Sequence, residues 1–593
     1  MAVAVFILCV FRGGMGQMVS GLPYKDSDDA MRMLQVLDLR NDGDWYDLSQ
    51  PRLNPPAGVP MHWSRLPDLP ILGMLAMTEP MLGRERAMLI SAYAVPALLG
   101  VAFFAAFVWA ATPLTGRAGQ PFSGLIGLCL LIPMFAFAGG RIDHHGWQLL
   151  LAILSAGALL RVAKGSRAPG LPMVAGCIGA LGLWVGAEAI PSVAFGAAVL
   201  TLTWLRQGRP GAAALAIFGV GLMIATTLII PIALAPGERT SSACDAFSLL
   251  SVGLGSAVAL FGVGALTVEL TLQPVRTAFR FGVAALMGTL LLGTLYVLFP
   301  DCVGGPYAGL SAEAALLVER VGEAQPLWTT IVNRPALAAQ FASLPLLALS
   351  MALWRSTRCD ADERTLWLSA ALLVAASILV QFWQLRASLL ANAYAGLVLC
   401  WWAASVGAKI DQTRQLLPRL LRRAGPALLV ALLPGSIVLL ANTLTAAEKL
   451  DEPSEPFDIR PATALLNSPA YTMDAPLLIA APINVGASLL LLTPHQVLAA
   501  PYHRNTEGLR DIMQVFYRDE ATARTAITRR HVDLLLLYPD ESIASHERRE
   551  DSTLFYDELL QGETPEWLES VPLDGSTRLF RVAGPASGTA IEP

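Results

Sequence analysis

The chain has 593 residues, of which 54% are hydrophobic and 15% are charged, and its mean hydropathy is +0.54. Soluble proteins of ordinary composition are less apolar, so the sequence indicates a polytopic α-helical membrane protein. The net charge of -5 excludes a basic surface for nucleic acid, because the lysines and arginines fall in short clusters between apolar runs. The seven cysteines show no C-x-x-C spacing, which argues against a structural zinc site.

Runs of apolar residues divide the chain into candidate membrane spans. A span needs about 20 apolar residues, and about thirteen runs meet that criterion. The first lies within 1–22, and a long polar segment, 23–86, follows it. The other runs are 87–111, 122–138, 147–162, 171–186, 190–205, 211–235, 246–270, 279–299, 336–353, 366–382, 385–406 and 425–443. The sequence thus predicts a transmembrane domain over 1–443 with large outer loops at 23–86 and 300–334, and a smaller domain over 444–593.

Basic residues set the expected orientation, because short loops rich in lysine and arginine stay in the cytoplasm. Alternate loops carry these clusters, for example Arg161 with Lys164 and the run from Lys409 to Arg423. The remaining loops should face outward, together with everything after 443. All seven histidines fall on that side: His62, His144, His145, His495, His503, His531 and His546. We therefore expect a multi-pass protein with its C-terminal domain on the outer side of the membrane, which in a bacterial inner membrane is the periplasm.

Cys244 and Cys302 fall in two of the outer loops. An oxidising compartment preserves disulfides, so the topology predicts that these two cysteines pair. The alternative is two unrelated thiols.

The C-terminal part, 444–593, has the pattern of a small α/β domain. Short apolar runs of strand length occur at 477–481, 488–492, 496–499, 532–537 and 578–582. Residues 509–528 have helical periodicity with a charged face.

A polar break, Gly139 to Gly146, separates two long apolar runs and contains Asp143, His144 and His145. Carboxylate oxygen and imidazole nitrogen can hold a divalent cation there. The alternative is that these residues only cap helix ends at the interface.

The first outer segment contains Asp26, Asp28, Asp29 and Arg32. Carboxylates this close repel one another, so a cation or an arginine is expected beside them. The alternative is a solvated helix N-terminus, where the helix dipole favours aspartate. The large outer loop carries Glu323, a residue that would ordinarily be a surface glutamate.

The order and sidedness of these motifs resemble those of the GT-C glycosyltransferases, in particular the catalytic subunit of archaeal and bacterial oligosaccharyltransferases. Asp26 with Arg32 matches the first-loop motif of that family, and Asp143-His144-His145 matches its second acidic motif. Glu323 matches the third motif, Thr-Ile-x-Glu, only at its hydrophobic and Glu positions. The family's Trp-Trp-Asp-Tyr-Gly motif, which reads the asparagine sequon, is absent.

The resemblance implies a divalent cation, Mg²⁺ or Mn²⁺, held by Asp26, Asp143 and His145, with His144 a neighbour and Asp28 the substitute should Asp26 be misaligned. Asp26 or Glu323 would orient or deprotonate the acceptor. Arg386, at an outer span end, is similar to the family's arginine that binds donor phosphate. An interfacial arginine with no such role is the alternative for Arg386.

The expected function is inverting, metal-dependent transfer of a sugar or oligosaccharide from a polyprenyl phosphate or pyrophosphate donor. The acceptor would be a glycan, a glycolipid or a protein. A transporter or a non-catalytic flippase accessory is the competing class, although a transporter would place ionisable residues in mid-span. Within enzymes, single-sugar transfer from a polyprenyl monophosphate to a glycolipid is the alternative.

Overall fold

The computed structural model describes residues 1–12, 24, 26–41, 43–131, 135–272, 274–305, 310–311, 315, 324–410, 425–426, 428–430, 432–433, 436, 458–473, 475–538 and 554–583. The chain divides into two compact units. The described residues of unit 1 fall within 1–23, 63–309 and 320–447, and those of unit 2 within 24–62, 310–319 and 448–593.

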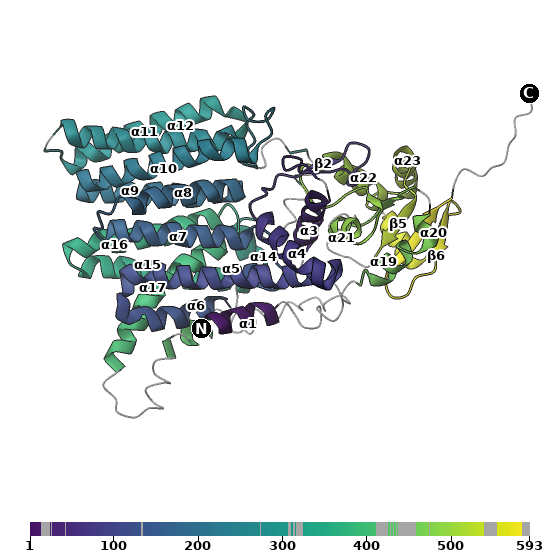
Figure 1. Cartoon of the computed structure of the whole chain (residues 1–593), viewed down its shortest axis with the longest axis horizontal. Coiled ribbons are helices and arrows are strands. Elements are labelled where there is room, and N and C mark those ends of the chain that lie inside the picture. The colour runs from purple at the N-terminus through teal and green to yellow at the C-terminus, as the bar shows by residue number, and fades with distance from the viewer. Residues whose placement is uncertain are drawn as a thin grey trace, which may run out of the picture. The chain divides into compact units, whose positions relative to one another are not determined.

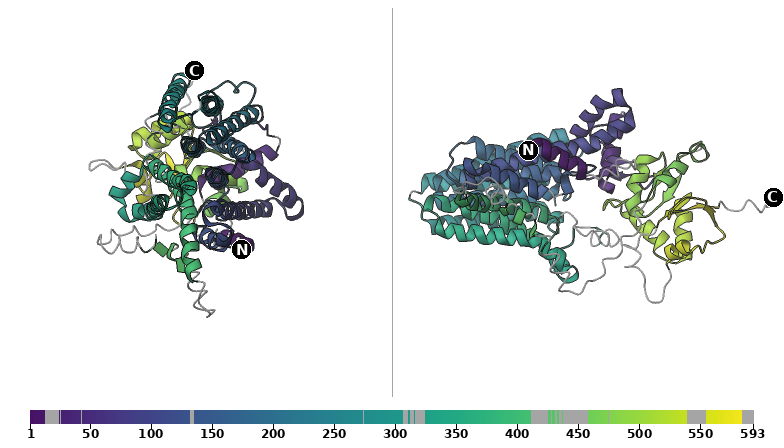
Figure 2. Two further views of the ribbon diagram at one scale, coloured as in Figure 1. Left: turned by 90° about the vertical axis from the view of Figure 1, so that its left-hand side faces the viewer. Right: turned by 90° about the horizontal axis from the view of Figure 1, so that it is seen from below.

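Unit 1 is helical, and its long helices run side by side with nearly parallel axes (Figure 1). Figure 2 shows them end-on in its left view. The helices are α1 (Ala2–Arg12), α4 (Asp68–Leu82), α5 (Arg84–Thr115), α6 (Gln120–Leu131), α7 (His145–Ala163), α8 (Gly170–Val185), α9 (Ile190–Gln207), α10 (Arg209–Ala233), α11 (Leu249–Thr271), α12 (Thr277–Leu298), α14 (Leu327–Asn333), α15 (Pro335–Arg358), α16 (Ala361–Gln381) and α17 (Ala387–Ile410). Short 3-10 turns precede or follow several of them: η1 (Arg117–Gly119), η2 (Phe135–Phe137), η3 (Ala187–Ala189) and η4 (Pro300–Cys302).

Nine helices of the described part are long and apolar enough to cross a membrane. The protein is therefore a multi-pass membrane protein, but the expected thirteen spans are not all found. The run at 171–186 forms α8, whose 16 residues are short for a span, and the run at 122–138 gives a 12-residue α6. Most of 425–443 and the second half of the first run lie outside the described residues.

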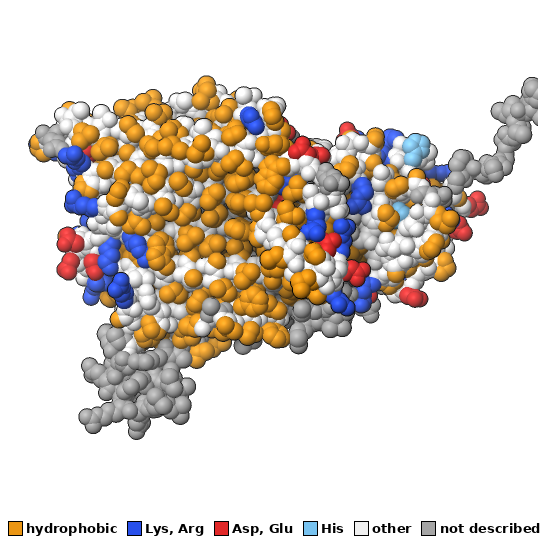
Figure 3. All heavy atoms as spheres, viewed as in Figure 1, with side chains coloured by type: hydrophobic (Ala, Val, Ile, Leu, Met, Phe, Trp, Pro, Cys, Tyr) orange, Lys and Arg blue, Asp and Glu red, His pale blue; other side chains and the backbone are white. Residues whose placement is uncertain are grey.

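Close helix packing in unit 1 depends on small residues. A Cβ added to Gly219 of α10 would lie 2.5 Å from the Cα of Ala259 in α11, and one added to Gly262 of α11 would lie 2.6 Å from the Cα of Ala216. Small residues let membrane helices approach in this way, because lipid supplies no hydrophobic force between helices. Hydrophobic side chains dominate the face of the bundle that Figure 3 shows, and Lys and Arg gather at its left-hand end.

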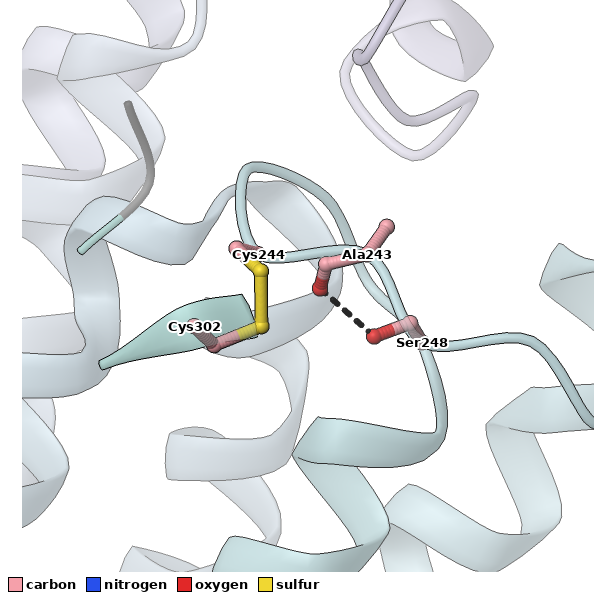
Figure 4. Close-up of a disulfide and its surroundings, with 4 residues drawn as sticks. All are labelled: Ala243, Cys244, Ser248 and Cys302. Carbon is pink, nitrogen blue, oxygen red and sulfur yellow. Dashed lines mark hydrogen bonds between the residues drawn. A yellow bond between two sulfur atoms is a disulfide. The ribbon is translucent and has the colours of Figure 1, made fainter. Parts of the chain in front are cut away.

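A disulfide joins Cys244 and Cys302, with their Cα atoms 5.1 Å apart (Figure 4). Cys244 lies in the loop between α10 and α11, and Cys302 ends the short turn η4 after α12. The Ser248 hydroxyl donates to the Ala243 carbonyl at 2.8 Å beside the bond. The two cysteines are thus paired as the topology of the outer loops predicts.

Unit 2 contains a five-stranded mixed sheet in the order β4-β3-β5-β7-β6. The strands are β3 (Leu478–Ala480), β4 (Gln496–Val497), β5 (Leu534–Leu537), β6 (Leu568–Val571) and β7 (Arg578–Val582). β3 pairs in parallel with β4 and β5, whereas β7 pairs antiparallel with β5 and β6. The helices of this unit are α3 (Ser27–Arg40), α19 (Arg460–Leu466), α20 (Pro469–Thr472), α21 (Ile483–Leu492), α22 (Thr506–Phe516), α23 (Glu520–Arg530) and α25 (Phe555–Gln561).

The segment after α3 packs within unit 2. Its short strands β1 (Ser49–Gln50) and β2 (Val59–Pro60) form a hairpin, and Leu53 makes a parallel bridge to Val497 at the β4 edge. The Arg530 side chain donates to the Pro55 carbonyl at 2.8 Å. The sequence predicts that 23–86 is a loop of the transmembrane domain. The described residues within 24–62 of this segment instead fall in the same compact unit as the sheet.

Two of the expected C-terminal elements are wrong. Residues 488–492 were expected to form a strand but belong to α21, because a short continuous apolar run fits a buried helix equally well. The single helix expected over 509–528 is two helices, and Asp519 caps the second by accepting from the Thr522 backbone N–H at 3.0 Å. The other four expected strands are present as β3, β4, β5 and β7.

Candidate functional site

The loop before α7 is held against two other helices of unit 1. The Gly139 N–H donates to the Cys9 carbonyl of α1, and the Gly140 N–H donates to the Ala92 carbonyl of α5, both at 2.8 Å. Gly140 has a φ of +90°, a conformation that favours glycine. These bonds position Asp143 and His144, which are both buried.

Asp143 is surrounded by positive or protonatable groups. One carboxylate oxygen accepts from the His145 backbone N–H at 3.0 Å, and the other pairs with the Arg141 guanidinium. The His145 Nε2 lies 3.9 Å from the same carboxylate. Burial by itself would raise the pKa of Asp143, but His145, Arg141 and His144 together lower it below its usual value. Asp143 is therefore an ionised carboxylate, the form that binds metal.

Glu188, in the turn η3 between α8 and α9, connects three other side chains. Its Oε2 accepts from Gln148 Nε2 at 2.7 Å and lies 2.8 Å from His144 Nε2. Its Oε1 pairs with the Arg386 guanidinium. Sequence reasoning missed Glu188 as a site residue, although an acidic residue in a short turn between two apolar runs is a signal that could have identified it.

Metal-ligating atoms of His144, His145 and Glu188 lie within 4.8 Å of one another. The His144 Nδ1 atom is buried and has no hydrogen-bond partner among the described residues, whereas its Nε2 atom faces Glu188 at 2.8 Å. Two imidazoles and a carboxylate, with the Asp143 carboxylate adjacent, are the donors that suit Zn²⁺ and other divalent transition metals. The donor set therefore fits a divalent cation, with His144 as a candidate ligand beside His145.

The other expected site residues are distributed as follows. Arg386 lies in this cluster through its ion pair with Glu188. Asp26, Asp28 and Arg32 belong to unit 2, and Glu323 lies outside the described residues. The Asp26 carboxylate caps α3 by accepting from the Asp28 and Asp29 backbone N–H groups at 3.0 and 3.2 Å. The roles expected for Asp26 and Glu323 stay predictions.

No family model matches the sequence, and no curated protein matches it. Solved structures of the archaeal oligosaccharyltransferase AglB from Archaeoglobus fulgidus are similar to it. The complex with an inhibitory peptide and a dolichol-phosphate has a TM-score of 0.67 and 12% identity, over 91% of this chain and 69% of that one. The complex with Zn and sulfate has a TM-score of 0.61 and 12% identity, over 91% of this chain and 67% of that one. At this identity the similarity shows a common fold.

Proposed function

We propose that this chain, which has the fold of the GT-C membrane glycosyltransferases, transfers a sugar or oligosaccharide from a polyprenyl phosphate or pyrophosphate donor to an acceptor. The observation that carries the proposal is the cluster of Asp143, His144, His145, Glu188 and Arg386 at one end of the helices of unit 1. The similar archaeal structures were solved with a dolichol-phosphate and with Zn and sulfate, which supports a lipid phosphate and a divalent cation as ligands here. The reaction would take place on the periplasmic side.

Asp143 and His145 would hold the cation, and His144 and Glu188, whose ligating atoms lie within 4.8 Å of one another and of His145, would be further candidate ligands. Mg²⁺ or Mn²⁺ is the ion that the family resemblance implies. A bound cation of this kind neutralises charge that develops on a leaving phosphate, an effect typically worth several kcal/mol. The Arg141 guanidinium keeps the Asp143 carboxylate oriented through their ion pair.

Arg386 would bind the donor phosphate. Its guanidinium presents several N–H donors in a planar fork, a shape that suits phosphate oxygens. In the described residues it pairs with Glu188, so a phosphate would compete with that carboxylate or share the arginine with it. The His144 Nε2 atom lies 2.8 Å from the Glu188 carboxylate. A phosphate bound at Arg386 would therefore also lie near His144.

Asp26 or Glu323 would orient or deprotonate the acceptor, a general-base contribution of about 10²- to 10⁴-fold. An inverting transfer then follows when the acceptor nucleophile attacks the anomeric carbon from the face opposite the phosphate, and the phosphate leaves with the bonding electrons. Because the sequon-reading Trp-Trp-Asp-Tyr-Gly motif is absent, a lipid-linked glycan, a glycolipid or a protein hydroxyl is a better acceptor than a sequon asparagine.

Incubation of membranes that contain the full chain with a radiolabelled polyprenyl-linked sugar tests the proposal. Transfer should occur, should stop on addition of EDTA and should return with Mn²⁺ or Mg²⁺. Asp143→Ala should reduce it by at least about 100-fold. Glu238→Ala is the matched control, because Glu238 is an exposed carboxylate in the loop that follows α10. Full transfer by Asp143→Ala, or transfer indifferent to EDTA, would refute the metal-dependent reaction.

A further inference from the structure

A basic pocket lies at the end of α7 farthest from the Asp143 loop. α7 has 19 residues, so its two ends are about 27 Å apart. The pocket has a volume of about 360 Å³ and is lined by Thr112, Pro113, Gly116, Arg117, Arg161, Lys164 and Ser166. This volume falls in the range of small-ligand sites. Three of its seven lining residues are cations, and none is acidic.

Neutral backbone groups hold two of these cations in place. Pro113 has no N–H, so the Trp109 carbonyl one turn earlier lacks its usual helical donor, and Arg161 Nη2 donates to it at 2.7 Å. Arg161 Nη1 also donates to the Gly157 carbonyl at 2.7 Å, and the guanidinium lies 3.9 Å from the centre of the Trp109 ring. Lys164 Nζ donates to the Pro113 carbonyl at 2.6 Å near the end of α5.

Acidic side chains of the described residues do not balance the positive charge at this pocket. Among the residues that the structure describes, no carboxylate forms an ion pair with Arg117, Arg161 or Lys164. The C-termini of α5 and α7 contribute negative dipole ends of about half a charge each. Among the described residues, three cations against about one unit of negative dipole charge leave a surplus of about two positive charges.

A phosphate group is the anion that fits this surplus, and the membrane offers it as a lipid headgroup. The hydrocarbon core is about 30 Å thick, so a pocket about 27 Å along α7 from the candidate site is at the depth of the opposite headgroup layer. Trp109, which is 37% exposed, is of the residue type that favours that interface. Basic pockets between membrane helices bind anionic lipid headgroups by these same contacts.

We infer that the Arg117, Arg161 and Lys164 pocket is a binding site for the phosphate headgroup of an anionic phospholipid, in the leaflet opposite the candidate glycosyl-transfer site. Arg161 and Lys164 are held in advance by carbonyl groups, so little side-chain ordering opposes binding. Arg117 is exposed at the rim and closes over the headgroup. The site is independent of the proposed reaction.

The test uses the purified full-length protein in a neutral detergent. Short-chain phosphatidylglycerol, short-chain phosphatidylcholine and inorganic phosphate are titrated in parallel, with bound lipid counted by native mass spectrometry and the thermal midpoint recorded. Phosphatidylglycerol should bind and raise the midpoint, whereas phosphatidylcholine and inorganic phosphate at equal concentration should not. The double variant Arg117→Gln with Lys164→Gln should bind phosphatidylglycerol about 30-fold more weakly, which corresponds to about 2 kcal/mol.

Arg161 is left unchanged, because its bonds to the α5 and α7 carbonyls support the fold. The matched control is Arg209→Gln with Arg276→Gln, two exposed cations at the N-terminal ends of α10 and α12 that do not line the pocket. This control should keep the affinity of the unaltered protein. Equal phosphatidylglycerol binding by both double variants would overturn the site. An equal response to phosphatidylglycerol and phosphatidylcholine would also overturn it, and an equal response to inorganic phosphate would replace the lipid with a free anion.

Discussion

The Glu188 carboxylate contacts His144, Gln148 and Arg386. Glu188→Gln tests whether this carboxylate helps to bind the metal or serves only as the counter-ion of Arg386. The substitution preserves the shape of the side chain but removes its charge and one of its acceptor oxygens. Charged hydrogen bonds are about twice as strong as neutral ones. Loss of a group that orients a metal-binding histidine typically lowers metal affinity about 10- to 100-fold, and loss of a direct ligand would reach the upper end. We expect Mn²⁺ to bind the variant about 10- to 100-fold more weakly.

Arg386→Gln should act in the opposite direction. The guanidinium pairs with the same Glu188 carboxylate that a cation would use, and like charges close together repel. Removal of the Arg386 charge should raise Mn²⁺ affinity several-fold, while it weakens binding of the lipid-linked donor. The two substitutions should therefore change Mn²⁺ affinity in different directions although they break the same ion pair.

Mn²⁺ binding is measured on the purified full chain by electron paramagnetic resonance of free Mn²⁺, with Glu238→Gln as the matched control. The thermal midpoint of each variant reports whether it folds. If Glu188→Gln binds Mn²⁺ within twofold of the unaltered protein while Asp143→Ala loses binding, Glu188 serves only as the counter-ion of Arg386. If Asp143→Ala also retains binding, the metal site is not in this loop.

Three further predictions concern stability. Cys244→Ser removes the disulfide, which joins residues 58 positions apart, and should lower the free energy of unfolding by about 4 kcal/mol by the chain-entropy model. A reductant should then no longer change the thermal midpoint of the variant. A variant with the thermal midpoint of the unaltered protein would contradict this prediction. Arg530→Ala removes the bond to the Pro55 carbonyl and should make segment 49–60 more sensitive to limited proteolysis, whereas an unaltered cleavage pattern would show that the bond is dispensable. Glu269→Gln leaves Arg280 without its ion-pair partner, so the free energy of unfolding should fall by roughly 3–5 kcal/mol and should partly recover when Arg280→Gln is added.

The composition and the loop chemistry of the sequence determined much of the fold. Long apolar runs must form helices in a bilayer, because every backbone polar group has to be satisfied within the segment. Cys244 and Cys302 were paired by topology, since alternation of loops placed both on one side. The Asp143-His144-His145 cluster was recognisable because its members are adjacent in the chain, so their proximity requires no tertiary contact.

Only the tertiary structure decided which distant residues join that cluster. Glu188 is 44 residues from His144, and Arg386 is 198 residues from Glu188; side chains from different helices meet according to how the helices pack, which local pattern does not encode. The same reason explains why part of segment 24–62 belongs with the sheet of unit 2, through the bridge from Leu53 to Val497. It also explains why 483–492 is a helix, because a buried apolar run takes its form from its neighbours when its own period is ambiguous.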